Sequence, residues 1–131
     1  MPFPAKVSPQ SRRKKLILCI DDQQPGIRAR KLILEAAGYR VLTASSGRIG
    51  LRLLRRHRVH VVVLDYRMPN MDGEAVAREI RRVHPHITVI LLSGQINLPP
   101  DVLSAVDAFV SKGEPPAVLL QHLTALAEGG L

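Results

Sequence analysis

Four short apolar runs, each followed at once by a polar residue, constrain the fold of this chain more than any other feature. The runs cover residues 16–20, 61–64, 89–92 and 108–111. The residues that follow them are Asp21, Asp22, Asp65, Ser93 and Lys112. Continuous apolar runs of this length, with turn residues after them, are typical of buried strands in a parallel sheet. We therefore expect an α/β domain.

The polar residues after these runs indicate a single functional site. Ligands of an open parallel sheet bind outside the carboxyl ends of its strands. Three carboxylates, one hydroxyl and one ammonium group are therefore expected to meet at one end of the sheet. Each residue alone also fits an ordinary role as a helix cap, a turn residue or a surface lysine. Because all four strand ends carry suitable groups, we favour a common site.

Helical periods alternate with strands along the rest of the chain. Strands are expected over 16–20, 39–44, 59–64, 87–92 and 107–111, and the more polar 39–44 is expected at a sheet edge. Helices are expected over 25–37, 45–57, 74–83, 100–105 and 117–127. Five such β-α units predict a doubly wound sheet with helices on both faces.

The apolar positions of three helices predict which faces pack inward. The first helix has a stripe at Ala29, Leu32, Ile33, Ala36 and Ala37. The third and last helices are expected to bury Val76, Ala77, Ile80 and Val83, and Leu119, Leu120, Leu123 and Leu126, respectively.

Composition limits the class of protein. A chain of 131 residues suffices for one domain, and 46% hydrophobic with 3% aromatic residues means that aliphatic side chains fill its core. Residues 1–13 are interpreted as a flexible basic arm and residues 14–131 as the folded domain. No apolar stretch reaches the ~18 residues of a membrane span. The single cysteine, Cys19, lies in an apolar run and fits a core residue of a cytoplasmic protein.

The formal net charge of +8 raises the question of an anionic partner. Such a balance can attract nucleic acid or an acidic protein surface. We interpret it as solvated helix faces and a basic tail, because no motif that reads a DNA groove accompanies the charge.

The predicted cluster has a definite chemistry. Carboxylates held close together repel one another, and a hard divalent cation relieves the repulsion. Magnesium prefers one or two carboxylates together with water and phosphate oxygens, so Asp21, Asp22 and Asp65 predict an Mg²⁺ site. A carboxylate can also attack phosphorus to form an acyl phosphate. Asp65 follows the most apolar run, which is expected at the centre of the sheet, and is the predicted nucleophile.

These residues make the chain resemble a response regulator receiver domain of two-component signalling. The likeness rests on residues 20–22, on Leu64-Asp65-Tyr66-Arg67-Met68-Pro69-Asn70-Met71-Asp72-Gly73, and on 92–94 and 109–112. It covers about residues 14–128. The resemblance implies a (βα)5 flavodoxin-like fold with strand order 2-1-3-4-5.

The resemblance implies a phosphoryl-transfer role for the strand-end residues. Asp65 matches the acceptor of a phosphoryl group from a sensor histidine kinase or a histidine phosphotransfer protein. Ser93 and Lys112 match the groups that bind the phosphoryl oxygens. The implied Mg²⁺ ligands are Asp21, Asp22, Asp65 and the backbone carbonyl of Arg67.

It also implies a conformational switch made by Ser93 and Phe109. When the hydroxyl moves toward the phosphoryl group, an aromatic ring can fill the space behind it. The surface of the fourth helix, fifth strand and fifth helix would then change, and a downstream protein or a second copy of the chain would bind there.

Two residues depart from what this resemblance leads us to expect. Gly113 follows Lys112 where the family usually has a proline, often with a cis bond, so a trans bond is expected here. Arg67 places a long cation two residues after Asp65, and we expect it to change how long the phosphoryl group persists.

Three other functions are alternatives to a phosphoacceptor. A haloacid-dehalogenase-like phosphatase needs Asp-x-Asp on the first strand, and Gln23 stands at its second Asp position. A nucleic-acid-binding protein would use the basic arm with the second and third helices. A receiver that never takes phosphate is disfavoured, because every acceptor-site residue is intact.

Overall fold

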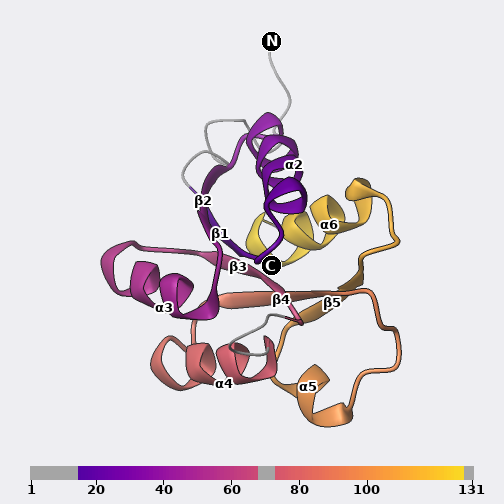
Figure 1. Cartoon of the computed structure of the whole chain (residues 1–131). Helices are drawn as coiled ribbons and strands as arrows, with labels where there is room; N and C mark the ends of the chain where they lie inside the picture. The colour runs from indigo at the N-terminus through magenta and orange to yellow at the C-terminus, as the bar shows by residue number, and fades with distance from the viewer. Residues whose placement is uncertain (1–14, 68–72, 129–131) are drawn as a thin grey trace.

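The computed structural model describes residues 15–67 and 73–128 and shows five parallel strands in one sheet (Figure 1). The strands are β1 (Leu16–Ile20), β2 (Arg40–Ala44), β3 (Val61–Asp65), β4 (Thr88–Ser93) and β5 (Ala108–Ser111). Their order is β2-β1-β3-β4-β5, which confirms the doubly wound flavodoxin-like fold. As expected, β2 lies at an edge and β3 at the centre.

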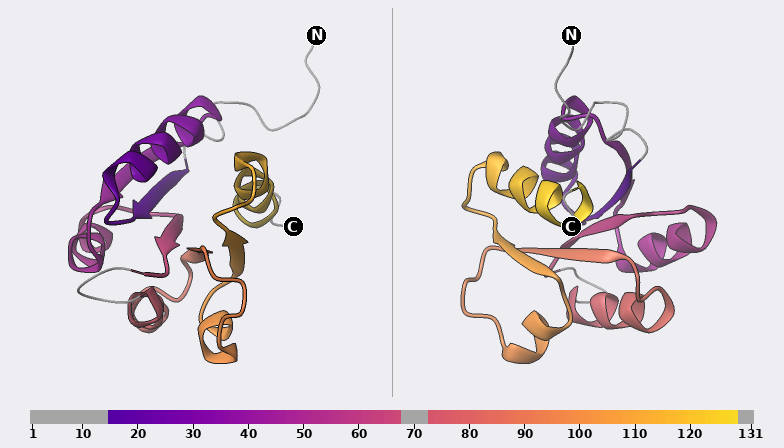
Figure 2. Two further views of the ribbon diagram at one scale, coloured as in Figure 1. Left: turned by 45° about the vertical axis from the view of Figure 1, so that its right-hand side comes forward. Right: turned by 180° about the vertical axis from the view of Figure 1, so that it is seen from behind.

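In the part of the chain that the structure describes, five helices cover the sheet, and Figure 2 shows α2 and α6 on one face and α3, α4 and α5 on the other. They are α2 (Gln24–Ala36), α3 (Gly47–Arg56), α4 (Gly73–Val83), α5 (Pro100–Ser104) and α6 (Pro116–Leu123). A π-helical turn, η1 (Thr124–Glu128), continues α6. No helix among the described residues is long and apolar enough to cross a membrane.

Local sequence signals account for where these helices begin and end. The Ser46 hydroxyl caps α3 by accepting a hydrogen bond from the Ile49 N–H at 3.2 Å. Pro25 lies in the first turn of α2 and Pro116 in the first turn of α6, where a missing N–H costs nothing. Gly38 has φ 104°, a left-handed conformation that ends α2 and that side chains other than glycine rarely adopt.

Alternating strand residues build two apolar layers. Leu16, Leu18 and Ile20 of β1 pack in the layer under α3, α4 and α5. Ile17 and Cys19 pack in the layer under α2 and α6. Among the described residues, the buried polar side chains are Asp21, Asp65 and Ser93, and all three lie at the carboxyl ends of strands.

The inward face of α2 differs from the predicted stripe. Its buried residues are Ile27 and Leu34, whereas Leu32 is 68% exposed and Ala29 and Ala36 are also exposed. Arg30 lies between Ile27 and Leu34 on the same helical face. A charged residue at a core-facing position interrupts the apolar stripe, so counting apolar residues gave the wrong phase.

Two residues expected in the core are exposed at helix ends. Val83 is the last residue of α4 and is 45% exposed. Leu126 lies in η1, where the wider π-helical turn breaks the α-helical period, and it is 36% exposed. The expected arm over residues 1–13 lies outside the described residues.

Candidate functional site

Three carboxylates meet at the carboxyl end of the sheet. Asp21 follows β1, Asp22 is the next residue, and Asp65 ends β3, the neighbour of β1. One oxygen from each of the three lies within 4.8 Å of the others. Asp21 is 1% and Asp65 3% exposed, whereas Asp22 is half-buried. The expected meeting of these acids is therefore confirmed.

Ser93 ends β4 and Lys112 directly follows β5, at the same end of the sheet as the carboxylates. The Lys112 Nζ lies 2.8 Å from Asp65 Oδ1. The backbone N–H of Lys112 donates to the Ser93 carbonyl oxygen at 2.8 Å, which holds the two strand ends together. Ser93 is 2% exposed and follows Leu92, the residue that pairs with Asp65. Its hydroxyl oxygen accepts a hydrogen bond from the Gln95 N–H at 2.9 Å.

Asp21 is fixed by two further donors. Its Oδ1 accepts from the backbone N–H of Gln23 at 2.9 Å, and its Oδ2 lies 3.2 Å from the Arg30 guanidinium. Sequence reasoning did not include Arg30 in the site. No sequence signal singled it out, because its place on the inward side of α2 follows from the burial of Ile27 and Leu34, which the apolar pattern did not predict.

Burial destabilises the ionised form of Asp65. Loss of solvent raises the pKa of the Asp65 carboxyl above its usual value, and the nearby charge of Asp21 raises it further. Hydrogen bonds from Lys112 and from the backbone N–H of Arg67 act in the opposite direction. Three hard oxygen donors with excess negative charge are the ligands that Mg²⁺ prefers, so the cluster fits this cation.

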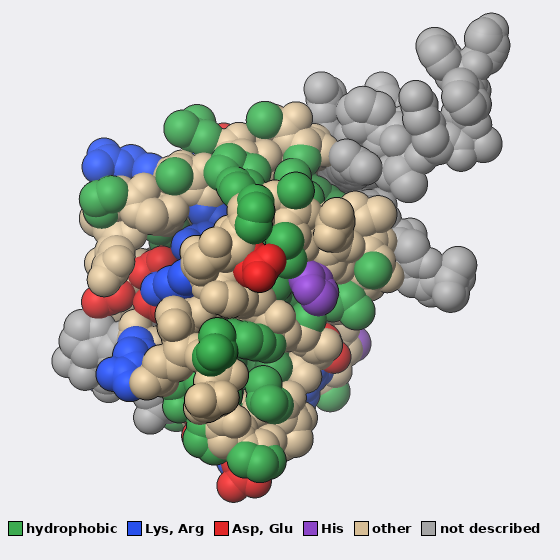
Figure 3. Space-filling model, turned by 90° about the vertical axis from the view of Figure 1, so that its right-hand side faces the viewer, with side chains coloured by type: hydrophobic (Ala, Val, Ile, Leu, Met, Phe, Trp, Pro, Cys, Tyr) green, Lys and Arg blue, Asp and Glu red, His purple; other side chains and the backbone are tan. Residues whose placement is uncertain are grey.

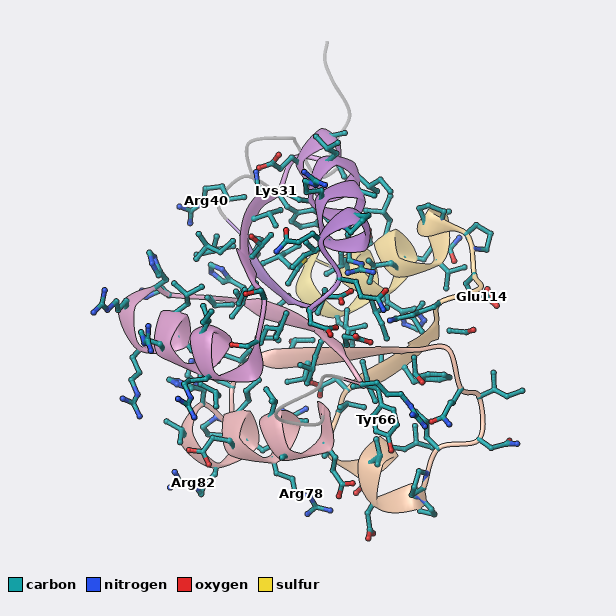
Figure 4. The ribbon with its side chains drawn as sticks, viewed as in Figure 1. Lys31, Arg40, Tyr66, Arg78, Arg82 and Glu114 are labelled. Atoms are coloured by element: carbon teal, nitrogen blue, oxygen red, sulfur yellow. The ribbon has the colours of Figure 1, made fainter. Side chains whose placement is uncertain are left out.

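The remaining predicted residues lie around this cluster. Phe109 is partly buried and, like Tyr66, packs against the apolar layer under α3, α4 and α5. Figure 4 shows Tyr66 on that side of the sheet. The side chain of Arg67 is exposed. The described residues contain no cis peptide bond, so the expected trans bond before Gly113 is confirmed.

Figure 3 shows acidic and basic side chains adjoining one another in a hollow of the face that carries α5, β5 and α6. Apolar side chains gather separately on the same face. Close contact between opposite charges next to apolar surface is the setting in which electrostatic interactions are strong.

Comparisons with known proteins agree with this geometry. A family model for the response regulator receiver domain matches residues 17–124. The transcriptional regulatory protein GlrR of Escherichia coli (strain K12) is 37% identical over 99 residues, which are 73% of this chain and 22% of that protein. AfsQ1 of Streptomyces coelicolor is 36% identical over 117 residues, which are 87% of this chain and 52% of that protein. The chain thus spans about a fifth of one relative and about half of the other.

Solved structures give the same result. The response regulator TrrA of Thermotoga maritima, in complex with Mg(2+)-BeF, is 30% identical, with a TM-score of 0.81 over 86% of this chain and 98% of that one. A response regulator receiver domain protein of Clostridium thermocellum is 32% identical, with a TM-score of 0.79 over 85% of this chain and 92% of that one. From its fold, its strand-end cluster and these matches, the chain belongs to the response regulator receiver domain family.

Proposed function

We propose that this domain accepts a phosphoryl group on Asp65 from the phosphohistidine of a sensor histidine kinase or a histidine phosphotransfer protein. The single observation that carries the proposal is the setting of Asp65. This buried carboxylate contacts an ammonium group and lies within 4.8 Å of two more carboxylates. A nucleophile, a charge-neutralising lysine and a cation site are thereby assembled at one point.

The chemistry is an in-line transfer from a phosphohistidine donor to a carboxylate acceptor. A carboxylate oxygen of Asp65 bonds to phosphorus while the phosphorus–nitrogen bond of the phosphohistidine breaks, and the imidazole leaves with the electron pair. Lys112 offsets charge on the phosphoryl oxygens. The Ser93 oxygen already accepts from Gln95, so its own proton is available for a phosphoryl oxygen.

The cation belongs to the same proposal. Asp21, Asp22, Asp65 and the backbone carbonyl of Arg67 would hold Mg²⁺, which when bound supplies positive charge to the transferring group. The complex of TrrA with Mg(2+)-BeF supports this assignment, because that relative is 30% identical and shares the fold.

The proposed output is a change of the surface formed by α5, β5 and α6. Movement of Ser93 toward the phosphoryl group would let Phe109 turn inward from its partly buried position. Leu103 of α5 is 42% exposed and Ile96, just before this helix, is 72% exposed, so apolar surface is present for a downstream protein or for a second copy of the chain. Because the domain would modify only itself, we propose a signalling role and not that of a metabolic enzyme. We place this role in the cytoplasm because the chain belongs to the response regulator receiver family.

Incubation with acetyl phosphate and Mg²⁺, followed by intact mass spectrometry, tests the proposal. The wild-type chain should gain the mass of one phosphoryl group, and the gain should disappear in Asp65→Asn or after chelation of the metal. Asp101→Asn removes an exposed carboxylate of α5 and is the matched control. An equal mass gain in Asp65→Asn would overturn the assignment.

The geometry disfavours the phosphatase alternative. That reaction would use Asp21 as the nucleophile, but Asp21 is engaged by Arg30 and by the Gln23 N–H. Hydrolysis of a generic phosphate ester that survives Asp65→Asn and is lost in Asp21→Asn would favour a phosphatase instead.

A further inference from the structure

Arg30 is a second cation at the phosphoacceptor site, and no motif of the receiver family led to it. It projects from the inward face of α2, and its side chain is only 16% exposed. Within the described residues its one hydrogen-bond acceptor is Asp21, at 3.2 Å. The guanidinium has five N–H donors, so this single contact leaves most of them for water.

Arg30 also lines a cavity. A cavity of about 350 Å³ lies beside Asp21 between α2 and the loop that joins β5 to α6. Its wall includes Arg30, Lys112, Leu92, Leu119 and Glu114. Figure 4 shows Glu114 on that loop. The Arg30 side chain therefore borders a space whose wall is largely apolar and carries Lys112 and Glu114.

The charge balance of the site depends on Arg30. With Lys112 alone, the three carboxylates would carry two excess negative charges and attract a divalent cation strongly. Arg30 reduces this excess to one, so a divalent cation alone would leave the site positive. A phosphoryl group in place of the free carboxylate adds about one further negative charge. Only cation and phosphoryl group together then make the site neutral.

We propose that Arg30 is a positioning residue that couples metal binding to phosphorylation. It weakens the binding of a divalent cation to the unmodified domain by competing for Asp21. It strengthens retention of the phosphoryl group once the cation is present, because its charge is then needed. This inference rests on the phosphoacceptor function proposed above.

The test compares wild type with Arg30→Met, which keeps the length of the side chain and suits the apolar cavity. Mg²⁺ is titrated into the unmodified domain, and the amide NMR signals of Asp22 and Tyr66 report the dissociation constant. Beryllofluoride, a phosphoryl analogue, is then titrated at saturating Mg²⁺. The variant should bind Mg²⁺ alone about 3- to 10-fold more tightly and beryllofluoride more weakly by a similar factor.

Two other variants make the result specific. Arg28→Met removes an exposed arginine of the same helix and should change neither constant. Arg30→Lys keeps the charge and should stay close to wild type in both titrations. Should Arg30→Met fail to fold, Arg30→Gln is expected to show the same two opposite shifts.

Opposite shifts are the signature of the proposed coupling, because a purely structural role would move both constants in the same direction. Unchanged constants, or shifts of the same sign, would overturn the role of Arg30 and leave the phosphoacceptor function intact. If wild type binds no beryllofluoride even with saturating Mg²⁺, the phosphoacceptor proposal fails, and this inference fails with it.

Discussion

Two arginine–aspartate pairs stand at opposite ends of the same sheet, and their surroundings differ. At the amino end, Arg81 of α4 contacts Asp107, which directly precedes β5. Arg81 also donates to the carbonyl oxygens of Ala105 and Ile87, each at 3.2 Å, and of Pro85 at 3.5 Å. Asp107 accepts from the Val89 N–H at 2.7 Å. At the carboxyl end, Arg30 makes one contact, to Asp21.

The difference shows how the same type of ion pair can serve two purposes in one protein. The Arg81 pair uses nearly all its donors and joins α4, β4 and β5, so it cannot rearrange without losing several hydrogen bonds. The Arg30 pair is more deeply buried but adjoins a cavity and a cluster of excess negative charge. We therefore expect the Arg81 pair to support the fold and the Arg30 pair to adjust the site.

The largest expected effect comes from breaking the amino-end pair. Arg81→Met leaves three backbone carbonyls without their Arg81 donor and should lower the free energy of unfolding by about 2 kcal/mol. Urea denaturation measures the loss, and Mg²⁺ affinity should not change. Arg78→Met, which removes an exposed arginine of the same helix paired with Glu74, is the control and should alter stability little. Equal losses in both variants would contradict the comparison.

A smaller effect is expected at the carboxyl end, from Gly73→Ala. A Cβ atom at Gly73 would lie 2.7 Å from Tyr66 Cα and 2.8 Å from the Asp65 carbonyl oxygen, so the backbone beside the acceptor must shift. Misplacement of a reacting group by a fraction of an ångström should slow phosphorylation by acetyl phosphate about tenfold. The rate is followed by intact mass spectrometry.

The control for this prediction is Gly94→Ala at the same end of the sheet. A Cβ atom there has no neighbour within 4 Å among the described residues, so the rate should stay close to wild type. If Gly73→Ala and Gly94→Ala react equally fast, the tight approach of Gly73 does not position Asp65.

The smallest expected effect is a gain in stability from Asp65→Asn without Mg²⁺. Burial raises the pKa of Asp65 in the folded state, so its ionised form lowers stability above the unfolded value of 3.8. The variant should therefore unfold a few degrees higher at pH 7. Below about pH 3.8 both states bind the proton and the difference should vanish. A variant less stable than wild type at pH 7 would contradict this explanation.

Sequence reasoning predicted the strand-end cluster because the rule that places it depends on topology alone. Once the runs at 16–20 and 61–64 are parallel neighbours, Asp21 and Asp65 must lie close together. Arg30 could not be predicted in this way, since its place follows from the rotation of α2 about its own axis. That rotation is set by packing of Ile27 and Leu34. Because the charged Arg30 lies on the same face, it interrupts the apolar stripe, and the sequence pattern therefore indicated the wrong rotation. Val83 and Leu126 show the same limit at helix ends, where packing stops before the apolar pattern does.

Chemical mapping of the phosphoryl group tests the central claim most directly. After reaction with acetyl phosphate and Mg²⁺, borohydride reduces an acyl phosphate selectively, and tryptic peptides are sequenced by mass spectrometry. Cleavage after Arg58 and Arg67 isolates residues 59–67, in which Asp65 is the one carboxylate. The account predicts the reduced residue at Asp65 and at no other carboxylate. Reduction at Asp21 or Asp22, or none in the peptide 59–67 of a phosphorylated chain, would contradict it.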